Sequence, residues 1–123
     1  MVLTIKWKDS NMTEKELMNH FTNFILPYQR RVIDQPPLKQ EYIVEEMFEQ
    51  VEKEYQGFTS TNPIAKEKWH VIKNSFFSQI IGLIEDKSFD ELNQKLHQLS
   101  NVIVESILEL YEEKTSSNIS SDN

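Results

Sequence analysis

The chain has 123 residues, with 20 acidic against 13 basic side chains and a formal net charge of -7. This length suits a single domain that buries roughly two-thirds of the surface of its unfolded chain. The acidic charge repels phosphate backbones, which argues against nucleic acid as a direct partner. The sequence contains no cysteine, which excludes a disulfide framework and a thiolate metal site.

Hydropathy gives no sign of a membrane segment. No apolar run approaches the ~20 residues of a membrane span, and the first ten residues lack the longer apolar core of a secretory signal. We therefore expect a cytoplasmic protein that does not contact a membrane. Lys, Asn, Ile and Glu are abundant relative to Arg and Gly, a composition typical of AT-rich genomes. We separately expect a bacterial or phage origin.

The N-terminal segment has the period-two pattern of a strand. Leu3, Ile5 and Trp7 fall on one side of it, and polar residues fall on the other. Nothing later in the chain resembles a pairing strand, so we predict an extended arm over residues 1–11. The arm would lie across the helices or dock on another chain; alternatively, folding begins at Met12 and the arm is dispensable.

A dense start signal predicts the first helix. Thr13 and Glu16 match a capping box, followed by a buried stripe that runs from Leu17 to Tyr28. Pro27 has no amide to give to the preceding turn, so it should kink the helix or restart it. The segment ends before Pro36.

The second helix is predicted over residues 38–56. Its buried stripe comprises Val44, Phe48, Val51 and Tyr55. Gly57 is expected to end it in a left-handed conformation, and residues 57–62 are expected to form a loop.

The third helix, over residues 63–86, carries the widest apolar face in the chain. Asn62 should cap its first amides, and Pro63 suits the first helical position. A face this wide needs neighbours on two sides, so we place this helix near the middle of a bundle. The predicted stripe is Ala65, Trp69, Ile72, Phe76, Ile80 and Leu83.

A capping box at Ser88 and Glu91 predicts the start of the fourth helix. Its heptad-like seam is interrupted only by Ser106. The members of the seam are Leu92, Leu96, Leu99, Ile103 and Leu110. Residues 115–123 have almost nothing to bury, so we predict a disordered tail.

Short connections make successive helices antiparallel. We therefore predict an all-α, up-down-up-down four-helix bundle with a short extended N-terminal arm and a disordered C-terminal tail. Residues 1–114, the arm included, would form its single domain.

Residues suited to catalysis or metal binding are sparse. Glu67 and His70 have the Glu-x-x-His spacing of carboxylate-bridged di-iron bundles, but such a site needs two copies. His20 and His97 have no nucleophile at a recognisable spacing, and no phosphate-binding loop is present. We expect no catalytic residues, no metal and no cofactor, and interpret the protein as a non-enzyme.

Surface charge suggests where a protein partner would bind. Four carboxylates recur every three or four residues on the second helix, at Glu41, Glu45, Glu49 and Glu52. This row is either a solvated face or an electrostatic landing surface for a basic partner, with Ile43 as a neighbouring apolar contact. Arg30 and Arg31 either complement a helix dipole or bind a partner's carboxylate.

Apolar residues also exceed what one-sided burial requires. Val104 and Leu108 lie away from the seam of the last helix, and Phe77 and Ile81 lie at the rim of the third. Contiguous apolar patches usually mark interfaces. A homodimer is therefore an alternative to a monomer.

These features favour a small acidic helical protein that binds a protein partner and inhibits or regulates it, as an immunity protein, antitoxin or regulatory adaptor does. An alternative, based on the arm, is an assembly chaperone or structural component of a phage or secretion particle, since strand addition is a common assembly device. A second alternative is an enzyme with an unrecognised site in the helical bundle.

Overall fold

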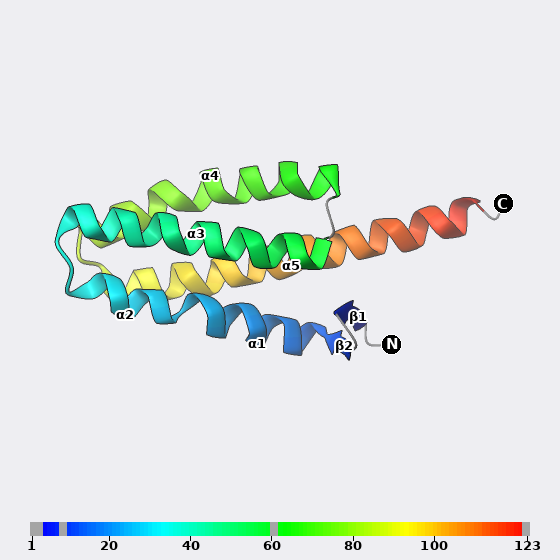
Figure 1. The fold of residues 1–123 in the computed structure, drawn as a ribbon, viewed down its shortest axis with the longest axis horizontal. Coiled ribbons are helices and arrows are strands. Elements are labelled where there is room, and N and C mark those ends of the chain that lie inside the picture. The colour runs from blue at the N-terminus through cyan, green and yellow to red at the C-terminus, as the bar shows by residue number, and fades with distance from the viewer. Residues whose placement is uncertain (1–3, 8–9, 60–61, 122–123) are drawn as a thin grey trace.

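The protein is an all-α, four-helix bundle preceded by a small hairpin (Figure 1). The computed structural model describes the backbone of residues 4–7, 10–59 and 62–121, and the side chains of residues 12–59 and 62–110. The elements are β1 (Thr4–Trp7), β2 (Ser10–Thr13), α1 (Glu14–Ile25), α2 (Pro27–Ile33), α3 (Pro37–Thr59), α4 (Pro63–Glu85) and α5 (Phe89–Ser121). The segment α1–α2, then α3, α4 and α5 run alternately up and down, which confirms the predicted architecture.

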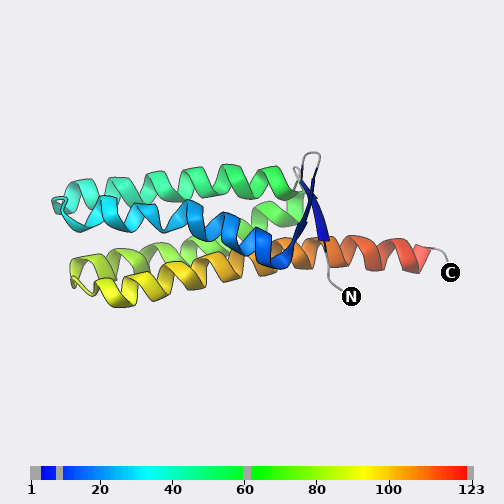
Figure 2. The same cartoon turned by 90° about the horizontal axis from the view of Figure 1, so that it is seen from below.

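The N-terminal arm is a hairpin rather than a lone strand. β1 pairs antiparallel with β2, with Ile5 opposite Met12 and Trp7 opposite Ser10, at the end of the bundle where α1 begins (Figure 2). The prediction that no pairing strand follows was wrong, because β2 has a polar sequence without period-two alternation and pairs through its backbone. Leu3 and the side chains of Ile5 and Trp7 lie outside the described residues.

Pro27 divides the first helical segment, as predicted. α1 ends at Ile25 and α2 restarts at Pro27, because proline cannot donate the hydrogen bond that would continue the helix. The cap at the start of α1 is also confirmed, since the amide of Glu16 donates to the hydroxyl of Thr13 at 3.2 Å.

Helix α3 continues beyond its predicted end. It passes through Gly57 to Thr59, and none of the described glycines has a positive φ, so the predicted left-handed stop was wrong. The reason is Phe58, which is only 2% exposed and packs against Phe21 with ring centroids 5.5 Å apart. Burying a phenylalanine contributes ~1.5–3 kcal/mol, more than the ~1 kcal/mol that glycine costs within a helix.

The start of α4 follows its sequence signals, since Asn62 accepts a hydrogen bond from the amide of Ile64 at 2.9 Å. The helix has neighbours on two sides, α3 and α5. However, α3 and α5 each contact all of the other helices, whereas α4 packs mainly against these two, so the expectation that α4 lies near the middle was wrong. Its outer face leaves Val71 66% exposed and Ile64 50% exposed.

Every predicted member of the α5 seam is buried. Val104 is buried as well, at 2% exposure, and Leu108 packs partly buried against the core. Phe77 and Ile81 of α4 are likewise partly buried. Of the four predicted positions, only Val104 is therefore fully covered, while Leu108, Phe77 and Ile81 keep part of their surface in solvent. A homodimer stays a prediction.

Helix α5 also differs from the prediction at its C-terminal end. The segment from Thr115, predicted to be disordered, continues the helix to Ser121 and projects past the other helices (Figure 1). Composition predicts disorder where nothing can be buried. Extending an existing helix, however, adds one backbone hydrogen bond for each residue fixed and needs no new nucleus.

The connection from α4 to α5 is a tight helix-ending turn. The amide of Ser88 donates to the carbonyl of Leu83 at 2.9 Å, and the amide of Lys87 donates to that of Ile84 at 3.0 Å. This is the Schellman pattern, in which glycine usually occupies the left-handed position. Here Lys87 occupies it, with a φ of 58°.

We expect Lys87→Gly to raise the free energy of unfolding by roughly 0.5–1 kcal/mol. The left-handed conformation costs a residue with a Cβ roughly 1–2 kcal/mol, and part of that gain is offset by the greater freedom of glycine in the unfolded chain. Urea denaturation measures the change. Lys87→Ala is the matched control, which removes the charge but keeps the Cβ; equal stability of both variants would contradict the argument.

Candidate functional site

A groove between α3 and α4 gathers charged and aromatic side chains. It has a volume of about 940 Å³, and its wall includes Tyr42, Glu45, Glu46 and Glu49 from α3 and Phe77 from α4. Tyr42 is 71% exposed, whereas Phe77 is partly buried and packs on Phe48 at 5.6 Å between ring centroids. The groove therefore combines a fixed aromatic ring with one that is largely in solvent.

The charge of this groove is negative. Of its three carboxylates, Glu46 is held by Arg31 of α2, with the guanidinium 2.8 Å from the carboxylate. Lys73 is the basic residue among the lining side chains. Within the described part of the chain, no ion pair involves Glu45 or Glu49, and both are exposed, so their charges face solvent.

The predicted acidic row is thus divided by the structure. Glu45 and Glu49 line the groove, Glu41 is exposed outside its lining, and Glu52 lines a separate pocket of about 270 Å³. The predicted apolar contact was wrong, because Ile43 is buried at 9% exposure. Exposed apolar surface on this helix instead comes from Leu38, at 87%, and Tyr42.

The sequence contains a signal for these exposed apolar residues of α3. Leu38, Tyr42, Glu45 and Glu49 follow one another at spacings of four, three and four, which places them on one helix face. The prediction from sequence named only the carboxylates of this face and left out Leu38 and Tyr42.

The two arginines lie in the last turn of α2, where a positive charge complements the helix dipole. The guanidinium of Arg31 lies 5.0 Å from the ring centre of Tyr28 and also holds Glu46. Arg31 is therefore engaged within its own chain, and Arg30 is exposed. A contact of either with a partner's carboxylate stays a prediction.

The histidines considered as ligands are dispersed. Glu67 and His70 are both exposed on α4, whereas His20 of α1 pairs with Glu54 of α3 at 2.8 Å. In the described residues, no group of three or more histidine, aspartate or glutamate side chains is arranged to hold a metal ion.

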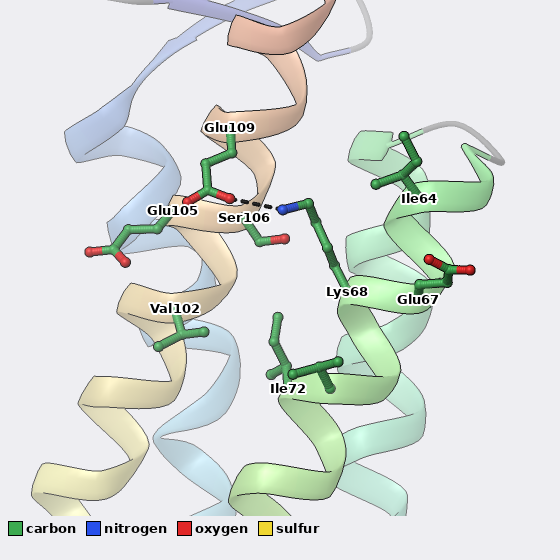
Figure 3. A pocket seen from close by; sticks show the side chains of 9 residues that line it. Ile64, Glu67, Lys68, Ile72, Val102, Glu105, Ser106 and Glu109 are labelled. Carbon is green, nitrogen blue, oxygen red and sulfur yellow. Dashed lines mark hydrogen bonds and ion pairs between the residues drawn. The ribbon is translucent and has the colours of Figure 1, made fainter.

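A second groove lies between α4 and α5 (Figure 3). Its volume is about 460 Å³, and its apolar lining residues are Ile64, Val71, Ile72 and Val102. The ammonium group of Lys68 reaches across to Glu109, with the two groups 2.9 Å apart. The sequence predicted exposed apolar residues on these helices at Val104, Leu108, Phe77 and Ile81 instead. Which residues stay exposed depends on how α5 packs against the other helices, and the sequence pattern does not reveal that.

Beneath this groove, the hydroxyls of Tyr55 and Ser106 form a buried hydrogen bond of 2.7 Å. It explains the polar interruption in the α5 seam, because Ser106 gives the tyrosine hydroxyl a partner within the core. Burial raises the pKa of Tyr55, although the bond to Ser106 and the charge of Lys68 act in the opposite direction.

No protein-family model, curated protein or solved structure matches this chain. Among the described helices, none combines the length and apolar character that crossing a membrane would require.

We expect the raised pKa of Tyr55 to weaken the fold at alkaline pH. In the unfolded chain the phenol ionises near pH 10, while the folded state retains its proton to higher pH. Stability is thus fully present below pH ~10 and falls as pH rises through the folded pKa. Chemical denaturation at several pH values should show a shallower alkaline loss for Tyr55→Phe.

The same variant should lose ~1 kcal/mol at neutral pH, because Ser106 is left without its buried partner. Tyr42→Phe, at an exposed ring, is the control and should follow the parent protein across the alkaline range. A Tyr55→Phe curve parallel to the parent curve would show that Tyr55 does not cause the alkaline loss.

Proposed function

We propose that this protein binds a basic segment of a protein partner through the α3–α4 groove, and inhibits or regulates that partner. The observation that carries the proposal is the composition of the groove. Three carboxylates and two aromatic side chains share one hollow, although they come from different helices.

The two kinds of side chain serve different steps of binding. Surface charges act mainly on the rate of association, because they steer a partner of opposite charge during encounter. At physiological salt they are screened beyond about 8 Å, so each carboxylate alone contributes little at equilibrium. Glu45 and Glu49 would therefore attract a lysine- or arginine-rich segment and orient it.

Holding the partner requires apolar burial. Tyr42 is 71% exposed and lines the same groove as the partly buried ring of Phe77. Aromatic side chains at the centre of an interface often dominate its binding energy, since they bury a large area and lose little conformational freedom. Tyr42 is therefore the residue expected to govern dissociation.

The alternative, an assembly chaperone or structural component of a phage or secretion particle, has one observation in its favour. The β1–β2 sheet has two strands, so each strand has an outer edge without a ladder partner in the described part of the chain. Such an edge can accept a strand from another protein. Under this alternative, the hairpin would carry the interaction.

The test begins with affinity purification from the native host and continues with association kinetics. We expect Glu45→Lys with Glu49→Lys to slow association by about tenfold at low salt, an effect that should shrink as salt rises. Tyr42→Ala should mainly accelerate dissociation. Circular dichroism checks that both variants keep the helical fold.

A matched control is Glu41→Lys with Glu85→Lys. It changes the net charge equally at two exposed positions that do not line the groove. If both double variants slow association alike, the effect comes from net charge alone and the groove is not the binding site. Loss of binding on deleting residues 1–11, with the groove variants unaffected, would favour the assembly alternative.

A further inference from the structure

The apolar part of the α4–α5 groove is open to solvent on one side. Ile64 is 50% exposed and Val71 is 66% exposed, and they stand seven residues apart, which is two helical turns on one face. Val102 of α5 is partly buried against the core and lines the same hollow of about 460 Å³. The spacing of two turns matches the apolar stripe of a helix laid along the groove.

The polar group at the floor of this groove is already satisfied. Ser106 lines the hollow, and its hydroxyl is hydrogen-bonded to Tyr55 at 2.7 Å. An apolar side chain placed over Ser106 would therefore not leave it as a buried group without a partner, which is the main cost of covering polar atoms. The floor suits aliphatic side chains.

The rim of the groove is acidic on both sides. Figure 3 shows Glu105 on the α5 side and Glu67 on the α4 side, each pointing away from the centre. Glu109 is engaged by Lys68 at 2.9 Å, so the cation within the groove neutralises a different carboxylate. In the described part of the chain, no ion pair involves Glu67 or Glu105.

We infer that the α4–α5 groove is a second docking site, which binds an amphipathic helix of a partner whose apolar face is flanked by lysine or arginine. The apolar face covers Ile64, Val71 and Val102, and the flanking cations reach Glu67 and Glu105. This site is separate from the α3–α4 groove, since no residue lines both.

The negative charge of the groove's rim favours a cationic helix over a second copy of the chain. A symmetric dimer brings the same patch of both subunits together, so the four carboxylates of two rims would face one another. Like charges held together across an interface are destabilising. A cationic helix removes that repulsion and buries the same apolar side chains.

The probe is a fluorescein-labelled synthetic peptide of about 18 residues, with leucines on one helical face and lysines on both flanks. Fluorescence anisotropy measures its affinity for the full chain, and amide chemical-shift changes in nuclear magnetic resonance locate it. We expect binding with shifts centred on Val71 and Val102. A peptide with glutamate in place of each lysine should bind at least about tenfold more weakly.

The variant Ile64→Gln with Val71→Gln should weaken binding of the lysine peptide by about tenfold, because both side chains are exposed and burial of each would be lost. The control variant, Ile33→Gln with Leu38→Gln, alters two exposed apolar residues that line neither groove and should leave the affinity unchanged. The peptide test is therefore independent of the kinetic test on Glu45 and Glu49.

Three results would overturn the inference. The first is equal affinity for the lysine and glutamate peptides, or no binding of either. The second is a loss of affinity in the Tyr42→Ala variant but not in the Ile64 and Val71 variant, which would assign the peptide to the other groove. The third is a dimer in analytical ultracentrifugation that the Ile64 and Val71 variant abolishes, which would make a second copy the occupant.

Discussion

The buried seam of α5 is the interaction on which the rest of the fold depends. Leu96, Leu99 and Ile103 are at most 2% exposed, and their helix contacts α1, α2, α3 and α4. Each other helix turns its apolar stripe inward, so the outer faces and the grooves between neighbouring helices remain in solvent. Both proposed docking surfaces are consequences of that arrangement.

Two polar contacts add direction to packing that is otherwise hydrophobic. Tyr55 and Ser106 join α3 to α5, and His20 and Glu54 join α1 to α3. Burial of apolar area is non-directional, whereas a hydrogen bond tolerates little displacement. These pairs therefore favour one longitudinal alignment of the helices, and with it the position of the residues that line each groove.

Helix α4 links the two grooves, which lie on different sides of it. One presents carboxylates with aromatic side chains, and the other presents aliphatic side chains with an acidic rim. Both compositions agree with the formal net charge of -7 in favouring cationic partners. The aromatic surface suits anchoring by stacking, while the aliphatic surface suits the apolar face of a helix.

The sequence by itself determined the helices, most of their boundaries and the class of fold, because a period of 3.6 residues and capping groups are local properties. It also placed Glu45 and Glu49 on an exposed face of the second predicted helix. Only the tertiary structure decided that Phe58 carries α3 past Gly57 and that Ile43 is buried. The tertiary structure likewise decided which side chains of α3, α4 and α5 meet in each groove, since that depends on the rotation and alignment of packed helices, which no single segment encodes.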